Sequence, residues 1–289
     1  MDINGKIGRT LKRSDFGRRI GVAGYRAITN LTHRSDADPV MVNTLAKAGT
    51  HLLMSLLDAF PAYRFSGRHF TFSVIDLHEP ELTERNARLA RQMSKVRRGQ
   101  YMTGHLAYHD SIARTVDDAG FRQLLVVRDP RALIVSGALY MRSYERHPLH
   151  ATVARRFTSD ADVIRGVIAG FDQDNGTRHL RPMSERLDAF VPWLDEPGAL
   201  LVRFEDLVGS AGGGTDELQF ETARRISEHL GLDAGPDTVR AAASAAFDTR
   251  AATFRSGEIE GWRRHLDGEL LELAEESCRA ASAKLGYVF

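Results

Sequence analysis

The sequence predicts an α/β protein with a central parallel sheet flanked by helices, on three observations. Short apolar runs over residues 40–42, 124–127 and 199–204 are typical of strands buried on both faces of a sheet. Segments with apolar residues at three- and four-residue spacing, typical of amphipathic helices, lie between these runs. A chain of 289 residues with 43% hydrophobic content is long enough to bury one large core. We therefore expect a single domain over residues 39–289, preceded by a basic segment over residues 1–38.

Net charge and cysteine content exclude several classes of protein. A formal net charge of +1 argues against a general nucleic-acid-binding protein, because such a protein carries a basic excess over a whole face. The single cysteine, Cys278, excludes an internal disulfide and a thiolate metal cluster, and it is compatible with a reducing compartment. No apolar run approaches the roughly 20 residues of a membrane-spanning helix. We therefore expect a cytoplasmic protein without a transmembrane segment.

Basic residues concentrate at the N-terminus. Residues 1–35 contain eight Lys or Arg against two Asp. Residues 15–31 have the pattern of a basic amphipathic helix, with Phe16, Ile20 and Ile28 on its apolar side. We expect this helix to cover part of the core of the domain, and peripheral docking on a membrane is the alternative.

A phosphate-binding loop is predicted between the first strand and the first helix of the domain. Its residues are Ala46, Lys47, Ala48, Gly49 and Thr50. The glycine lets the backbone approach a ligand, the helix start offers free amides, and the lysine supplies a positive charge. The loop lacks the first glycine of the usual nucleoside-triphosphate loop. An ordinary strand-to-helix turn is the alternative.

The next segments predict a strand over residues 70–75, a polar helix over residues 81–98 and a short strand within residues 100–109. Cations at the end of the helix suit a helix C-terminus: Lys95, Arg97 and Arg98. His105 lies near the carboxyl end of the second of these strands. Side chains at that edge of an open α/β sheet face the ligand crevice, which makes His105 a candidate base, with a structural role as the alternative.

The run over residues 124–137 is the second informative stretch. A buried strand ends at Arg128, Asp129-Pro130 begins a helix, and Ser136 lies two turns along it. Arg128 and Ser136 can therefore flank one position near the helix start, where a guanidinium fits a phosphate. Pairing of Arg128 with a neighbouring carboxylate is the alternative.

The remaining segments contribute further elements. Residues 142–182 read as an irregular polar insertion that shapes the pocket of a second substrate. A helix is predicted over residues 183–194, a flexible surface loop over residues 210–215, and a helix that begins at a cap formed by Asp216 with Gln219. Loops follow over residues 254–257 and 261–263. The last helix spans residues 267–285, and its spacing places Cys278 in the core.

Four of these segments, in this order, resemble the sulfotransferases that use 3′-phosphoadenosine 5′-phosphosulfate (PAPS), and the chain looks like a bacterial member of that family. The family's lysine-serine-glycine-threonine-threonine-tryptophan loop resembles Lys47, Ala48, Gly49, Thr50, His51 and Leu52. Its threonine-histidine-leucine segment is similar to Thr103, Gly104, His105 and Leu106. Its arginine-aspartate-proline-arginine motif with a later serine matches Arg128, Asp129, Pro130, Arg131 and Ser136. Its late arginine-lysine-glycine loop and tryptophan resemble Arg255, Ser256, Gly257 and Trp262.

The resemblance implies an activity and roles for these residues. The chain would transfer a sulfuryl group from PAPS to an acceptor hydroxyl and release adenosine 3′,5′-bisphosphate (PAP), without a metal. The loop from Lys47 to Leu52 would hold the 5′-phosphosulfate. Arg128, Ser136 and the loop over residues 255–257 would hold the 3′-phosphate. His105 would be the base, with a pKa near its ordinary value of about 6.5, and Lys47 would stabilise charge on the departing oxygen.

Several points stay open at this level. The acceptor is expected to be a carbohydrate or a secondary metabolite. Five aromatic residues are candidates to line its pocket, and packing in the core explains them equally well: Phe70, Phe72, Tyr101, Tyr108 and Tyr140. Leu52 stands where the family often has an adenine-stacking tryptophan, so an apolar contact with the base is expected there. A nucleotide-dependent small-molecule kinase and a non-catalytic member that binds nucleotide or membrane are the alternative functions.

Overall fold

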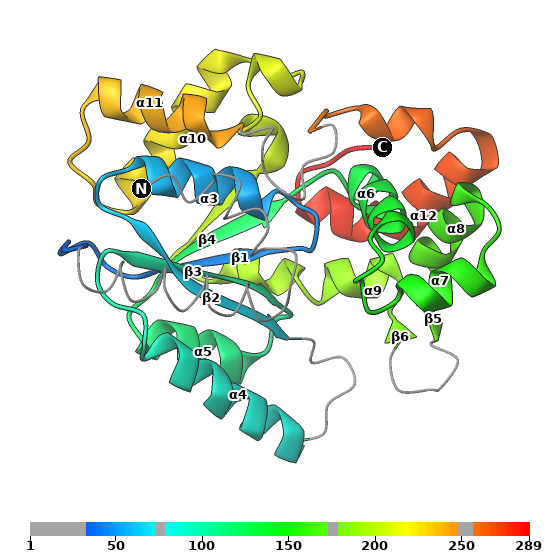
Figure 1. Cartoon of the computed structure of the whole chain (residues 1–289), viewed down its shortest axis with the longest axis horizontal. Coiled ribbons are helices and arrows are strands. Elements are labelled where there is room, and N and C mark those ends of the chain that lie inside the picture. The colour runs from blue at the N-terminus through cyan, green and yellow to red at the C-terminus, as the bar shows by residue number, and fades with distance from the viewer. Residues whose placement is uncertain (1–32, 73–78, 173–178, 248–256) are drawn as a thin grey trace.

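The centre of the protein is a five-stranded sheet in which every pairing is parallel (Figure 1). The computed structural model describes residues 33–72, 79–172, 179–247 and 257–289. The strand order is β2-β3-β1-β4-β7. The strands are β1 (Val40–Thr44), β2 (Arg64–Phe72), β3 (Gln100–Leu106), β4 (Arg122–Val127) and β7 (Ala199–Arg203). The predicted fold class, an α/β domain with a central parallel sheet flanked by helices, is confirmed.

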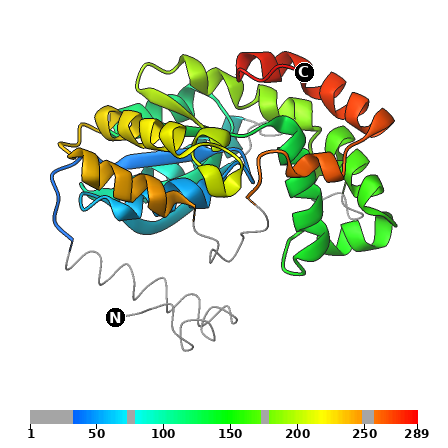
Figure 2. The ribbon, with the colours of Figure 1, turned by 90° about the horizontal axis from the view of Figure 1, so that it is seen from above.

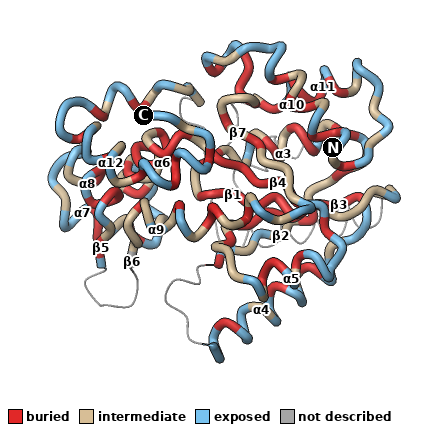
Figure 3. The backbone as a smooth tube through the Cα atoms, turned by 180° about the vertical axis from the view of Figure 1, so that it is seen from behind, coloured by how far each residue is buried: buried red, intermediate tan, exposed pale blue. Residues whose placement is uncertain are grey.

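The middle of the sheet is buried, as its apolar sequence predicts. All five residues of β1 are buried, and the red core in Figure 3 follows the central strands. β1 pairs with β3 and β4, and its last residue, Thr44, lies opposite Val126. The parallel pairing brings the carboxyl ends of the strands to one edge, which is where ligands bind in open α/β sheets.

Helices cover both faces of the sheet and extend beyond its carboxyl edge. One face packs under α3 (Thr50–Ala59), α10 (Asp216–His229) and α11 (Pro236–Ala246), and the other side carries α4 (Glu79–Met93) and α5 (Asp110–Asp118) (Figure 1). A second group of helices lies to one side of the sheet in Figures 1 and 2. It comprises α6 (Pro130–Ser143), α7 (His150–Arg156), α8 (Asp160–Ala169), α9 (Met183–Asp188) and α12 (Gly268–Lys284).

The prediction of an irregular segment over residues 142–182 is wrong. This segment contains α7, α8 and a small antiparallel pair, β5 (Phe171–Asp172) with β6 (His179–Leu180). Ser159 and Asp162 form a reciprocal capping box that begins α8. The buried face of α8 includes Val163, Ile164, Val167 and Ile168, which pack next to α6. Arg165 and Gly166 separate the two apolar pairs, so the stripe has ordinary helical spacing.

Several predicted boundaries also differ from the structure. α4 ends at Met93, so Lys95, Arg97 and Arg98 lie beyond it, and Arg98 pairs with Asp38 at 2.9 Å. The helix predicted over residues 183–194 divides into α9 and a 3₁₀ turn, η1 (Val191–Asp195), because a proline, which cannot donate the helical hydrogen bond, stands near the start of that turn. The helix α11, which the sequence analysis did not predict, begins with a proline, Pro236, at its first position.

The cap of α10 is Thr215 rather than Asp216. The Thr215 side chain accepts a hydrogen bond from the amide of Leu218, whereas Asp216 accepts from Ser210 in the preceding turn. The other 3₁₀ turns are η2 (Phe204–Asp206), η3 (Ser210–Gly212) and η4 (Gly261–Arg264). The predicted last helix matches α12, and Cys278 is buried on it.

Some expectations lie outside the described residues. These are the basic helix over residues 15–31, the end of the strand over residues 73–75, and two residues of the late loop, Arg255 and Ser256. Within the described ranges, no helix combines the length and the apolar character that crossing a membrane requires.

Candidate functional site

The loop between β1 and α3 has the backbone of an anion-binding turn. Lys47 and Gly49 both have positive φ angles, 75° and 109°. A β-carbon on Gly49 would lie 2.7 Å from Cδ2 of Phe204, so only glycine fits at this point. Lys47 is the only non-glycine residue with a positive φ among those described, and such conformations concentrate at functional sites.

The start of α3 presents unused backbone donors. The amides of Gly49 and Thr50 donate no hydrogen bond to any described residue, and α3 has no acidic residue in its first turn. Free amides and the positive end of the helix dipole favour an anion at this position. The buried methyl group of Ala48 packs into the core, and His51 is exposed on the first turn of α3. The loop therefore offers an anion its backbone rather than hydroxyl side chains.

The charge of Lys47 is directed toward α6. Its Nζ atom lies 3.9 Å from the centroid of the Tyr140 ring, a cation–π contact. Tyr140 stacks on Tyr144 with ring centroids 5.0 Å apart, and His147 meets the Tyr140 ring edge-on. α6 thus positions the lysine side chain beside the loop from which it projects.

His105 is held by Thr44 in the tautomer that a base requires. Its Nδ1 atom lies 2.8 Å from the carbonyl oxygen of Thr44 and 2.9 Å from the Thr44 hydroxyl. Because a carbonyl oxygen only accepts, Nδ1 carries the proton and donates it, and Nε2 retains a lone pair. Burial, followed by the nearby His69, lowers the pKa of His105 to about 4. The expectation of a pKa near 6.5 is therefore wrong, and the imidazole is neutral at pH 7.

Thr44 also connects His105 to the loop. Its hydroxyl lies 2.8 Å from the hydroxyl of Thr50 and 2.9 Å from Nδ1 of His105. The last residue of β1 therefore ties the first residue of α3 to an imidazole on the neighbouring strand. The glycine before His105 is required by packing, since a β-carbon on Gly104 would lie 2.8 Å from the backbone carbonyl oxygen of Phe70.

His69 is a neighbour of His105 that the sequence analysis missed. The two rings meet edge-on with centroids 4.8 Å apart, and His69 is bonded to the hydroxyls of Thr103 at 2.9 Å and Thr71 at 3.1 Å. Burial lowers the pKa of His69. Alternation along β2 was the available signal, because His69 and Thr71 lie on one face of the strand and Thr71 pairs with His105.

Arg128 is a partly buried guanidinium with spare hydrogen-bonding capacity. It lies 3.9 Å from the ring centroid of Phe204 and donates to the carbonyl of Glu258 at 3.0 Å, while its Nε atom is buried without a partner. Burial lowers the pKa of Arg128, although Glu205 opposes the shift. No carboxylate of the described residues forms an ion pair with it. These features leave room for an anionic ligand.

Phe204, at the start of η2, joins the loop to Arg128. A β-carbon on Gly49 would lie 2.7 Å from its Cδ2 atom, and the Arg128 guanidinium lies over its ring. It is 2% exposed, so it acts as a rigid spacer between the two candidate anion-binding groups. Sequence analysis missed this role because an aromatic residue at a strand end is also a common core residue.

The segment over residues 210–214, predicted as a surface loop, is largely exposed and also supports the late loop. The amide of Ile259 donates to the carbonyl of Gly212 at 3.0 Å, and the Gly257 carbonyl lies close to Gly212 as well. Glu258, between them, supplies the carbonyl that Arg128 contacts. The described part of the late loop therefore reaches the Arg128 region. Ser136, on α6, is partly exposed.

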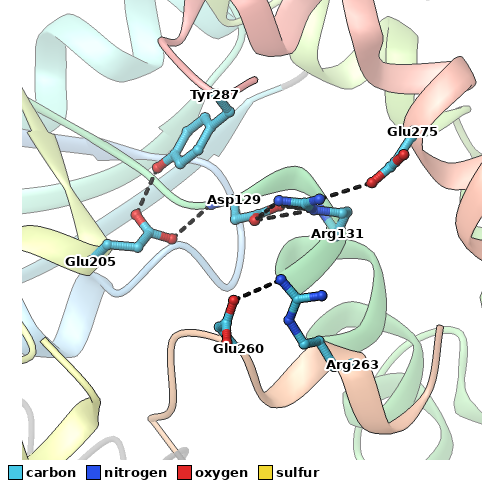
Figure 4. A network of polar contacts seen from close by, with 7 residues as sticks. All are labelled: Asp129, Arg131, Glu205, Glu260, Arg263, Glu275 and Tyr287. Atoms are coloured by element: carbon cyan, nitrogen blue, oxygen red, sulfur yellow. Dashed lines mark hydrogen bonds and ion pairs between the residues drawn. The ribbon is translucent and has the colours of Figure 1, made fainter. Parts of the chain in front are cut away.

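The second arginine of the motif, Arg131, has a structural environment (Figure 4). It pairs with Asp129 at 2.8 Å and with Glu275 of α12 at 2.8 Å, and its guanidinium lies over the rings of Trp262 and Phe289. The Asp129 amide donates to Glu205, which also accepts from the hydroxyl of Tyr287 at 2.7 Å. Arg131 thus ties the start of α6 to η4, α12 and the C-terminal residues.

The aromatic residues predicted to line a pocket or fill the core divide between the two roles. Phe72 and Tyr101 are buried, and the Tyr101 hydroxyl donates to Asp58 at 2.9 Å. Tyr108 packs edge-on against Trp193 and donates to Glu196. Phe70 is partly exposed next to Phe72, and Tyr140 contacts a predicted site residue, Lys47. No cluster of three potential metal ligands occurs among the residues that the structure describes.

The architecture is that of an α/β protein with a candidate anion-binding loop after its central strand. It is similar to the crystal structure of mouse sulfotransferase SULT7A1 complexed with PAP, with a TM-score of 0.56 and 16% sequence identity over 88% of this chain and 91% of that chain. At this identity the similarity shows a shared fold. No family model matches the sequence, and no curated protein matches it.

Proposed function

We propose that the chain is a sulfotransferase that moves a sulfuryl group from PAPS to an acceptor hydroxyl. The observation that carries the proposal is the Thr44 hydroxyl, which joins Thr50 of the candidate donor loop to Nδ1 of His105, the candidate base. Group transfer needs the donor and the base within one site, and this connection supports such a site at the carboxyl edge of the sheet.

The donor site uses the two anion-binding groups that Phe204 separates. The amides of Gly49 and Thr50, with the Lys47 ammonium, bind the 5′-phosphosulfate. Arg128, whose Nε atom has no partner, binds the 3′-phosphate. Ser136, Gly257, Arg255 and Ser256 are proposed to complete that phosphate site, and Leu52 to contact the adenine. The likeness to a fold that binds PAP in the mouse sulfotransferase supports this assignment.

Transfer is an in-line displacement at sulfur. The acceptor oxygen forms a bond to sulfur while the bond from sulfur to the bridging oxygen of the 5′-phosphate breaks, and PAP leaves. Nε2 of His105 takes the hydroxyl proton, and the Lys47 ammonium stabilises the charge that develops on the bridging oxygen. Because the positioned groups supply this stabilisation, the reaction as proposed involves no metal.

Ligand-induced stabilisation tests the donor assignment. A ligand that binds only the folded state raises the melting temperature (Tm) by mass action. PAP is expected to raise Tm more than AMP, because only PAP carries a 3′-phosphate, and Arg128→Ala is expected to remove the difference. Equal shifts with PAP and AMP in the unmodified protein would contradict the donor site. A larger shift with magnesium and ATP than with PAP would favour the kinase alternative.

A further inference from the structure

The Asn43 side chain lies between the ends of β1 and β3 at the carboxyl edge of the sheet. Its Oδ1 atom accepts a hydrogen bond from the Leu106 amide at 2.8 Å, and its Nδ2 atom donates to the Leu106 carbonyl at 3.3 Å. Both residues are buried, with 1% of their surface exposed. Leu106 directly follows His105 in the chain. Asn43 therefore holds the backbone next to the candidate base.

This side-chain contact replaces a backbone hydrogen bond between the two strands. β1 and β3 pair in parallel up to Asn43, which lies opposite Gly104, and the pairing ends there. One further step of the ladder would set Thr44 opposite His105, and the Leu106 amide would then donate to the Thr44 carbonyl. In the structure that amide donates to Asn43 instead. The Thr44 carbonyl lies 2.8 Å from Nδ1 of His105 and receives its proton.

The exchange of partners depends on Asn43, because a buried amide needs an acceptor. A buried N–H group without a partner costs more free energy than a typical hydrogen bond contributes. Without Asn43, the acceptor that a continued ladder offers the Leu106 amide is the Thr44 carbonyl. Pairing with the amide would turn this carbonyl away from Nδ1 of His105. The imidazole would lose the contact that keeps its proton on Nδ1.

We propose that Asn43 is a positioning residue: by binding the Leu106 amide it leaves the Thr44 carbonyl to His105, and so keeps Nε2 of the imidazole unprotonated. The consequence for the reaction rests on the proposed sulfotransferase function, whereas the choice of tautomer does not. Asn43 is buried, so it acts through His105 and not by contact with a substrate. Loss of its amide is expected to lower the rate of transfer without weakening the binding of PAP.

A general role in anchoring the end of β3 is the alternative, and a second side chain provides the control for it. Nε1 of Trp193, in η1, donates to the Leu106 carbonyl at 3.0 Å, and Trp193 is fully buried. Trp193→Phe removes this bond and leaves the Leu106 amide bonded to Asn43. Asn43→Leu keeps a side chain of similar size and removes both bonds. The two variants loosen the same residue, and only Asn43→Leu releases its amide.

The ¹⁵N NMR spectrum of the imidazole reports the tautomer directly, and the His105 signal is assigned by its absence in His105→Gln. At neutral pH the unmodified protein and Trp193→Phe are expected to be protonated at Nδ1 alone. In Asn43→Leu the Nε2-protonated form is expected to become the major one. An Nε2-protonated His105 in the unmodified protein would overturn the proposal whether or not a variant folds. The same tautomer in folded Asn43→Leu, or an equal change in both variants, would overturn it too.

Turnover, measured as release of PAP from PAPS with water in place of the acceptor hydroxyl, separates positioning from loosening. Asn43→Leu is expected to lower kcat about tenfold with an unchanged rise of Tm on PAP binding, and Trp193→Phe to keep kcat within about twofold. Equal falls in kcat, or a loss of PAP binding in Asn43→Leu, count against the proposal. If the tautomer changes as expected but PAPS is not turned over, the sulfotransferase proposal fails and the positioning role of Asn43 stands.

Discussion

The Nδ1 atom of His105 lies 2.8 Å from the carbonyl oxygen of Thr44, which fixes the imidazole tautomer through the backbone of the central strand. A carbonyl oxygen cannot be deprotonated or rotated away as a side chain can, so the orientation does not depend on pH. Nε2 is left as the proton acceptor. The arrangement holds His105 as a neutral imidazole whose direction is set by the sheet, which suits the proposed role as a base.

The pH profile of turnover follows from the lowered pKa of His105. A general base works only when it is unprotonated, so kcat/KM is expected to stay level from pH 8 down to about pH 5 and to fall near pH 4, the region of the His105 pKa. His105→Ala is expected to lower kcat by about 10² to 10⁴ with PAP affinity near normal. A fall in kcat/KM centred near pH 6.5, or full turnover in His105→Ala, would contradict the assignment. His229→Ala is the control, because His229 lies at the end of α10 and is bonded to the carbonyl of Gln123 near the start of β4, away from the carboxyl edge of the sheet.

The contribution of the Thr44 hydroxyl to the reaction can be tested without changing any charged residue that is proposed to bind a substrate. Thr44→Val removes the hydroxyl that bonds Thr50 and His105 but keeps the carbonyl that receives the Nδ1 proton. A typical hydrogen bond contributes about 1 kcal/mol, so kcat is expected to fall roughly fivefold to tenfold while PAP binding changes little. Thr44→Ser restores the hydroxyl and is expected to restore kcat. If Thr44→Ser is as slow as Thr44→Val, packing of the methyl group and not the hydroxyl connection is responsible.

The role of Lys47 is tested by separating the reaction rate from product binding. Lys47→Ala is expected to lower the transfer rate by about 10² or more, as the loss of a transition-state donor typically does. PAP lacks the sulfuryl group and the charge that develops on the bridging oxygen, so its affinity is expected to fall less. Tyr140→Phe keeps the ring under the ammonium and serves as the control. Rates and PAP affinities that fall by the same factor would indicate ground-state binding alone.

The sheet was predictable because buried parallel strands have a simple signature. The runs at Val40–Thr44 and Ala199–Arg203 are short, apolar and bounded by turns, and the structure places both in the central sheet. α8 has a local pattern as well, with two apolar pairs at helical spacing after a capping box at Ser159, but the polar segments on either side of it led to a prediction of irregular structure. Local patterns thus identified strands better than short helices.

The candidate site was only partly visible in the sequence. Lys47, His105 and Arg128 stand at strand ends, where position alone suggests a ligand. Phe204 has no local signal, because its role depends on two distant residues that surround it, Gly49 and Arg128. The pKa of His105 was misjudged for the same reason, since desolvation depends on residues packed around the ring.

Arg131 is expected to be structural, in contrast to Arg128. Arg131→Met leaves Asp129 and Glu275 without their partner in a mostly buried setting, so the free energy of unfolding is expected to fall by about 2 kcal/mol. Urea denaturation measures this change. Arg224→Met is the matched control, because Arg224 is an exposed arginine that also pairs with two carboxylates, and little change is expected there. Equal destabilisation in both variants would contradict the structural role of Arg131.

The stability of the protein is expected to decrease as the pH falls from about 6.5 to about 4, in part through His105. The folded pKa of about 4 lies below the unfolded value of about 6.5. Between these values the unfolded state binds a proton that the folded state does not, so acid favours unfolding and the stability is fully present only above about pH 6.5. A difference of this size corresponds to about 3 kcal/mol.

His105→Asn is expected to be less sensitive to acid, because its amide can still donate to the Thr44 carbonyl and carries no titrating group. Urea midpoints at pH 7.5 and pH 4.5 measure the effect in both proteins. An equal loss of stability in His105→Asn would mean that other groups, such as His69, whose pKa burial also lowers, dominate the acid response.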